Sequence, residues 1–150
     1  MPSTTQRDTL LAELRGRIPE ISPADAFARQ AQGALLIDVR DDGERSAGMP
    51  VGALGLSRGF LELRIEQAEP DRERPILALC GSGTRSLLAA DTLQRMGYRD
   101  VHSVAGGFER WKGEGLPVAT GALDADAAER YARQLRLPQV GEAGQAKLAA

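Results

Sequence analysis

Hydrophobic residues gather in short runs along the chain, separated by polar stretches that contain glycine and proline. The clearest runs are Ala-Leu-Leu-Ile-Asp-Val at 34–39 and Pro-Ile-Leu-Ala-Leu at 75–79. Short apolar runs of this kind are typical of strands that are buried on both faces of a parallel sheet. Two further strands are predicted at 53–56 and 101–104.

The stretches between these runs have the hydrophobic spacing of helices. Ser22 as N-cap and Pro23 as first helical residue mark the start of one helix. Helices are expected at residues 1–18 (with Leu10, Leu11, Leu14 and Ile18 apolar), 23–32, 59–69 and 86–96, and after Gly106-Gly107, where Trp111 is a core anchor. Strands that alternate with helices predict an α/β domain with a mainly parallel sheet.

Composition and charge restrict the class of protein. A chain of 150 residues with 42% hydrophobic and 27% charged residues is typical of one globular domain. No stretch approaches the ~20 apolar residues of a membrane helix, and the N-terminus lacks the apolar core of an export signal. The balance of 19 basic and 21 acidic residues does not fit a nucleic-acid binder. We therefore expect a cytoplasmic protein with neither membrane nor nucleic-acid partners.

The chain contains one cysteine, Cys80. A single cysteine excludes an internal disulfide and a cysteine-rich zinc site, and no metal site is predicted. It leaves two alternatives, an inert buried residue or a reactive thiol.

The position of Cys80 favours the reactive thiol. Cys80 follows the strand at 75–79 directly, and open α/β sheets bind ligands at the C-terminal ends of their strands. A glycine-rich loop and a helix N-terminus near Ser86 both favour an anion, here the thiolate. We predict Cys80 and Arg85 as catalytic residues. The loop residues predicted to contact the substrate are Gly81, Ser82, Gly83, Thr84 and Ser86.

Four other residues are candidates for supporting roles. Asp38 and Arg40 end the strand at the same sheet edge as Cys80, and they either orient Arg85 or the loop, or form a structural ion pair. Glu44 is a weaker candidate of the same kind. Arg58 either lines the mouth of the pocket or lies on a solvated face.

Residues 21–118 resemble the rhodanese family of sulfurtransferase domains. The matching features, in order, are Asp38-Val39-Arg40 with Glu44, Gly52-Ala53, the loop from Cys80 to Arg85, Gly106-Gly107-Phe108 with Trp111, and Gly115-Leu116-Pro117-Val118. The resemblance implies a three-layer α/β fold whose central, mainly parallel sheet of about five strands is flanked by helices. The chain departs from the family at Met49, where the family often has histidine.

The resemblance also implies a reaction. Phosphatases of the Cys/Arg type place five residues between the two, whereas four separate Cys80 from Arg85 here. The expected activity is therefore sulfane-sulfur transfer through a persulfide on Cys80, with thiosulfate or the persulfide of a cysteine desulfurase as donor. Two alternatives stay open. One is a Cys/Arg phosphatase or arsenate-reductase-like enzyme, and the other is a non-catalytic rhodanese-homology module that docks a partner.

The C-terminal stretch resembles a different family. Residues 129–138, Glu-Arg-Tyr-Ala-Arg-Gln-Leu-Arg-Leu-Pro, are similar to the start of ubiquitin-activating-like adenylyltransferases of molybdopterin and thiamine biosynthesis. This resemblance implies that a ubiquitin-like sulfur-carrier protein is the acceptor and that its C-terminus becomes a thiocarboxylate. The glycine-rich nucleotide loop of that family is absent from the 150 residues, so no ATP or other cofactor is expected in this chain.

We therefore expect three parts. They are an N-terminal helical extension at 1–20, a rhodanese domain at 21–120, and a linker with a helical tail at 121–150 that belongs to a following adenylyltransferase domain.

Overall fold

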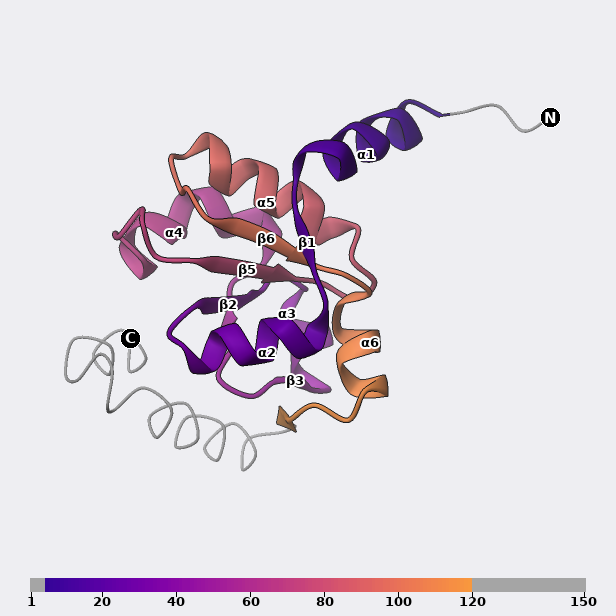
Figure 1. Ribbon diagram of the computed structural model, residues 1–150, viewed down its shortest axis with the longest axis vertical. Helices are drawn as coiled ribbons and strands as arrows, with labels where there is room; N and C mark the ends of the chain where they lie inside the picture. Colours follow the sequence, from indigo (N-terminus) through magenta and orange to yellow (C-terminus); the bar gives the residue numbers. More distant parts are fainter. Residues whose placement is uncertain (1–4, 120–150) are drawn as a thin grey trace.

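A five-stranded sheet forms the centre of the computed structural model, which describes residues 5–119 (Figure 1). All neighbouring strands of this sheet are parallel, in the order β1-β6-β5-β2-β4. The strands are β1 (Glu20–Ile21), β2 (Leu35–Asp38), β4 (Leu54–Gly55), β5 (Ile76–Leu79) and β6 (Val101–Val104). The predicted parallel sheet of about five strands is confirmed.

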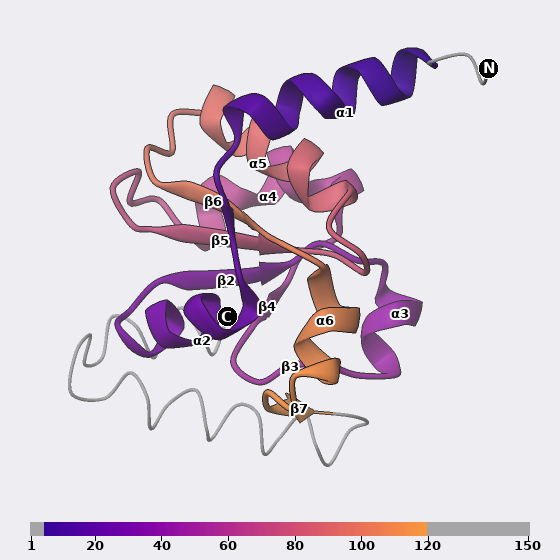
Figure 2. The ribbon, with the colours of Figure 1, turned by 45° about the vertical axis from the view of Figure 1, so that its right-hand side comes forward.

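Helices cover both faces of the sheet, as Figures 1 and 2 show. Apolar residues of α1 (Gln6–Arg17), α4 (Leu61–Ala68) and α5 (Arg85–Arg95) pack on one face. Those of α2 (Pro23–Ala31) and α6 (Gly107–Gly113) pack on the other. The predicted three-layer α/β architecture is therefore confirmed.

The central strand β5 shows why the chain forms these layers. Its four residues are all fully buried. Ile76 and Ala78 belong to the core on the α5 side, and Leu77 and Leu79 belong to the core on the α2 and α6 side. Because side chains alternate along a strand, a run of apolar residues is buried on both faces. This arrangement places Cys80 at the end of the middle strand.

Several predicted helix boundaries agree with the structure. The Ser22 hydroxyl accepts a hydrogen bond from the Asp25 N–H at 3.1 Å, and Pro23 is the first residue of α2. Helix α5 begins one residue earlier than predicted, at Arg85. In α1, Leu14 is buried, but Leu10 is 45% exposed, so its assignment to the apolar face was wrong.

Four short elements were not predicted. Residues 20–21 form an edge strand, and the stretch after β2 contains a short helix and a two-residue strand. The missed elements are β1, α3 (Asp42–Ser46), β3 (Met49–Pro50) and β7 (Val118–Ala119). Strands of two residues are too short to show a period, and α3 buries none of its side chains.

Two other features concern boundaries and extent. The helix predicted at 59–69 begins as a 3₁₀ turn at Arg58–Phe60 and continues as α4. Strand β3 pairs antiparallel with β7, outside the main sheet.

Within residues 5–119, every helix is too short or too polar to cross a bilayer. The predicted linker and tail at 121–150 lie outside the described residues.

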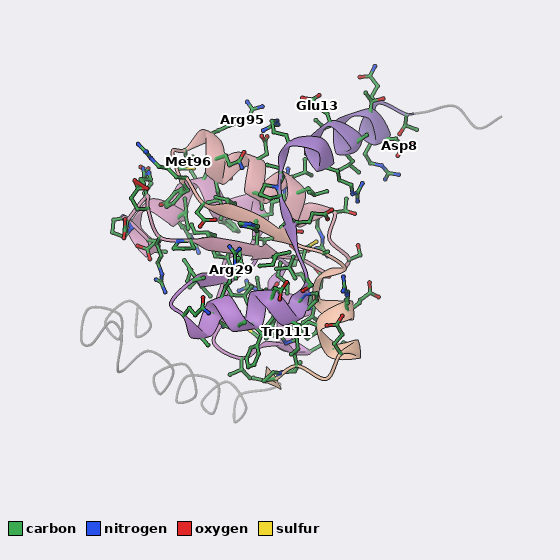
Figure 3. The ribbon with its side chains drawn as sticks, in the orientation of Figure 1. Asp8, Glu13, Arg29, Arg95, Met96 and Trp111 are labelled. Carbon is green, nitrogen blue, oxygen red and sulfur yellow. The ribbon has the colours of Figure 1, made fainter. Side chains whose placement is uncertain are left out.

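Trp111 anchors the layer formed by α2 and α6 (Figure 3). Its side chain is fully buried, its Nε1–H donates to the Pro117 carbonyl oxygen at 2.9 Å, and its ring meets the edge of Phe27 at 5.9 Å between centroids. We predict that Trp111→Ala lowers the free energy of unfolding by about 3–5 kcal/mol, since it removes a buried aromatic ring. Urea unfolding followed by circular dichroism measures this difference.

Leu63→Ala is the control for this substitution, because Leu63 is 74% exposed. It is expected to change the free energy of unfolding by less than about 0.5 kcal/mol. Equal losses in the two variants would contradict the anchoring role of Trp111.

Candidate active site

Cys80 and the loop after it lie at the C-terminal edge of the sheet, between β5 and α5. The neighbouring strand β2 ends at the same edge, where the Val39 N–H donates to the Leu79 carbonyl oxygen at 2.8 Å. The structure therefore brings the end of β2, with Asp38 and Arg40, beside the Cys80 loop, as the sequence predicts.

Polar groups of the loop and of α5 contact the sulfur of Cys80, which is fully buried. The Gly83 N–H donates to Sγ at 3.1 Å, and Sγ lies 3.4 Å from the hydroxyl oxygen of Ser86 on α5. That oxygen lies 2.7 Å from the hydroxyl oxygen of Ser103 on β6. Sequence reasoning missed Ser103, because the short pattern Val-His-Ser-Val does not show that this hydroxyl reaches the Cys80 loop.

Helix α6 holds the Cys80 loop from outside. The N–H groups of Phe108 and Glu109 donate to the carbonyl oxygens of Cys80 and Gly81, at 2.7 and 3.1 Å. Gly107 has φ +58°, and a Cβ there would lie 2.3 Å from the Cys80 carbonyl oxygen. Only glycine permits so close an approach. These hydrogen bonds direct the Cys80 and Gly81 carbonyls toward α6. The Gly83 N–H points toward the sulfur.

Arg85 forms a bidentate ion pair with Glu44 of α3. Its Nη1 and Nη2 lie 2.7 and 3.0 Å from the two carboxylate oxygens. Hydrogen bonds from Arg85 lower the pKa of Glu44 to about 2. The same hydrogen bonds raise the pKa of Arg85, with a smaller contribution from Cys80. Glu44 thus holds a permanent cation beside the loop.

Arg40 pairs with Asp38 and not with a residue of the loop. The Arg40 Nη2 lies 2.8 Å from the Asp38 carboxylate and donates to the Gly48 carbonyl oxygen at 2.6 Å. The Arg40 guanidinium also lies 4.0 Å from the centroid of the Phe108 ring. Both members of the pair are buried. Of the two alternatives for Asp38 and Arg40, this geometry favours a structural ion pair.

A hollow of about 400 Å³ opens over this site. It is lined by Arg40, Glu44, Ala47, Gly81, Ser82, Arg85, Phe108, Glu109 and Lys112. Arg58 is exposed and is absent from this lining, so the structure does not place it at the pocket mouth. Ala47, Glu109 and Lys112 were not predicted, because no motif marks them.

The arrangement suits a reaction at sulfur. The sulfur itself is buried, and the adjoining Gly81 and Ser82 line the hollow. Within residues 5–119, no group of three or more His, Cys, Asp or Glu side chains is placed to hold a metal ion. The geometry therefore offers a thiol with hydrogen-bond donors and a fixed guanidinium nearby.

Curated relatives of the chain include small sulfurtransferases. The thiosulfate sulfurtransferase GlpE of Haemophilus influenzae is 35% identical over 102 residues, which cover 67% of this chain and 94% of that protein. The thiosulfate sulfurtransferase GlpE of Pseudomonas entomophila is 38% identical over 92 residues, 61% of this chain and 83% of that protein.

Solved structures with the same fold include a sulfur transferase and a possible phosphatase. The polysulfide-sulfur transferase homodimer of Wolinella succinogenes has a TM-score of 0.68 and 31% identity, over 76% of this chain and 87% of that one. A protein of unknown function, a possible tyrosine phosphatase, from Rhodopseudomonas palustris has a TM-score of 0.67 and 32% identity, over 79% of this chain and 98% of that one.

The sequence-family model named Rhodanese-like domain matches residues 22–114. This range includes both strands that end at the site, the Cys80 loop and α6. The resemblance of residues 21–118 to the rhodanese family is thereby confirmed, and the chain belongs to the rhodanese-like domain family.

Proposed function

We propose that the chain is a rhodanese-type sulfurtransferase that carries sulfane sulfur as a persulfide on Cys80. This proposal rests on the hydrogen-bond contacts of the Cys80 Sγ atom. A loop amide donates to it at 3.1 Å, a buried hydroxyl lies 3.4 Å away, and a loop of four residues leads to Arg85. Such donors stabilise negative charge on sulfur. The names of the GlpE relatives support the same chemistry.

The reaction divides into two displacements. The Cys80 thiolate attacks the outer sulfur of thiosulfate, a new S–S bond forms, and the old S–S bond breaks as sulfite leaves with the electron pair. An acceptor thiolate then attacks the terminal sulfur of the persulfide, and Cys80 leaves as a thiolate. A cysteine-desulfurase persulfide is an equivalent donor. The 150 residues contain no second cysteine, so the sulfur acceptor belongs to another molecule.

The loop length argues against the phosphatase alternative. Four residues between Cys80 and Arg85 form a tighter turn than the five of Cys/Arg phosphatases. A tighter turn suits one sulfur atom better than a tetrahedral phosphate. The presence of both Cys80 and Arg85 argues against a module that only docks a partner.

Persulfide formation is the direct test of the proposal. We predict that the protein gains one sulfur atom, detected by intact-protein mass spectrometry, after incubation with thiosulfate or with a charged cysteine desulfurase. Cys80→Ser removes the nucleophile and is expected to gain none. If the folded protein gains no sulfur from either donor, the proposal is wrong. Turnover of a phosphate ester faster than sulfur transfer would instead support a phosphatase.

Arg85→Lys tests the role of the guanidinium. Lysine keeps the charge but cannot make the bidentate pair with Glu44 or present a planar fork to an anion. We predict a loss of about 10- to 100-fold in kcat/KM for thiosulfate, measured by sulfite release.

Arg95→Ala is the matched control for this substitution. Arg95 lies on the same helix, and its side chain is 75% exposed. Its kcat/KM is expected to equal that of the unmodified protein. A full rate in Arg85→Lys would contradict the role assigned to the guanidinium.

We further propose that the acceptor is a ubiquitin-like sulfur-carrier protein. The support is the resemblance of residues 129–138 to the start of adenylyltransferases that activate such carriers. Once a carrier C-terminus is adenylated by such an enzyme, the terminal persulfide sulfur attacks its carbonyl carbon and AMP leaves. An external thiol then cleaves the S–S bond, which releases the thiocarboxylate, and a second thiol returns Cys80 to its reduced form.

This acceptor is tested with an adenylated carrier, a thiol reductant and the persulfidated protein. We predict that the carrier replaces one oxygen with sulfur, seen by mass spectrometry, and that protein with Cys80→Ser gives no product. Free cyanide serves as the control acceptor. Transfer to cyanide without transfer to the carrier would reject the carrier and retain the sulfurtransferase.

A further inference from the structure

A chain of two hydroxyl groups leads from Cys80 into the core. The Ser86 hydroxyl oxygen lies 3.4 Å from Sγ and 2.7 Å from the Ser103 hydroxyl oxygen. All three side chains are fully buried. In the part of the chain that the structure describes, Ser86 is the one hydrogen-bond partner of the Ser103 hydroxyl. The hydroxyl chain therefore begins at Ser103 and ends at the sulfur.

We propose that Ser103 is a positioning residue, which directs the Ser86 hydroxyl proton toward the Cys80 thiolate. Ser103 does not touch the sulfur and acts through Ser86. The inference rests on the proposed function, because it concerns the ionised state that Cys80 needs in order to attack a sulfur donor.

The direction of the hydrogen bonds between Cys80, Ser86 and Ser103 depends on whether Cys80 is a thiol or a thiolate. Each hydroxyl has one proton and accepts through its lone pairs. In the thiol form, Sγ–H donates to the Ser86 oxygen, and Ser86 donates to Ser103. In the thiolate form, Sγ is only an acceptor, so Ser86 must turn its proton toward it. The Ser103 hydroxyl then donates to the Ser86 oxygen, which polarises the Ser86 O–H bond.

Without Ser103, the Ser86 hydroxyl has a competing conformation. A serine hydroxyl readily rotates to a nearby backbone acceptor instead. A donor on the Ser86 oxygen favours the rotamer that faces the sulfur. Ser103 thus stabilises the thiolate through geometry as well as polarisation.

The burial of Ser103 is otherwise unfavourable. It lies in β6 between Val101 and Val104 and pairs with Ala78 of β5. Removing a hydroxyl from water is unfavourable unless it is hydrogen-bonded. Two serines that satisfied only each other could be replaced by alanines at little cost. A purely structural role for the two serines does not explain why the Ser86 hydroxyl also lies 3.4 Å from Sγ of Cys80.

Charged groups near the sulfur come from other elements and are unchanged by substitution of Ser103. Arg85 of α5 interacts with Cys80 and is paired with Glu44 of α3. Arg40 is paired with Asp38 at the end of β2. His102 of β6 aligns with Leu77, whose side chain belongs to the opposite face of the sheet from Ser103.

The test is a titration of the free protein, without any sulfur donor. Because the chain has one cysteine, the ultraviolet absorbance that is lost in Cys80→Ser reports on the Cys80 thiolate alone. We expect Ser86→Ala to raise the midpoint pH of this titration by about one unit, and Ser103→Ala by about half a unit, or about threefold less thiolate at a given pH. In the Ser86→Ala background, Ser103→Ala is expected to cause no further shift.

Val104→Ala is the matched control, because it removes buried apolar volume from the same strand on the other face. It is expected to lower stability and leave the midpoint unchanged. Ser103→Thr retains the hydroxyl and is expected to keep the midpoint of the unmodified protein. The proposal is overturned if Ser103→Ala titrates like the unmodified protein, or if its shift persists in the Ser86→Ala background. Failure of persulfide formation would leave this titration unaffected, so the two proposals are tested separately.

Discussion

The proposed sulfur transfer depends on one constraint, the burial of a sulfur atom that would carry negative charge. Cys80 is fully buried at the end of the central strand, so water does not compensate that charge. Compensation must come from donors fixed by the fold, and each comes from a different element. The loop supplies the Gly83 amide, α5 supplies Ser86, and α6 turns the Cys80 and Gly81 carbonyls away. A close approach between Gly107 and the loop is therefore part of the chemistry and not merely of the packing.

The two arginines near the loop act differently because their surroundings differ. Arg40 is buried, and its contacts with Asp38, Gly48 and Phe108 leave it a fixed part of the wall. Arg85 is partly exposed and meets a single carboxylate. Helix α3 buries no side chain, so polar contacts position Glu44, including the Arg45 Nε donating to the Arg40 carbonyl oxygen at 3.1 Å. The cation at the loop is thus held by a surface helix.

The sequence predicts what local patterns encode. Strands β2 and β5 and the loop from Cys80 to Arg85 were recognisable because periodicity, glycine content and residue order mark them without reference to distant residues. Glu44 was one of several candidates to orient Arg85 or the loop, and the sequence could not select it, since it lies 41 residues from Arg85. Ser103 and Lys112 reach the site through sheet order and helix packing, which short patterns do not contain. For Arg58 the sequence left two alternatives, and the structure favours the solvated face, because its side chain is exposed and outside the pocket lining.

The segment around Met49 illustrates how backbone contacts make a side chain dispensable. The family often has histidine at this position, yet the segment here is held by other means. Met49 pairs with Ala119 through β3 and β7, and the carbonyl oxygens of Gly48 and Val51 accept from Arg40 and Gln30 at 2.6 and 2.9 Å. These acceptors belong to the main chain, which every residue type supplies. Replacement of the usual histidine is therefore compatible with an intact wall beside the pocket, and Arg40 connects that wall to the strand that ends next to Cys80.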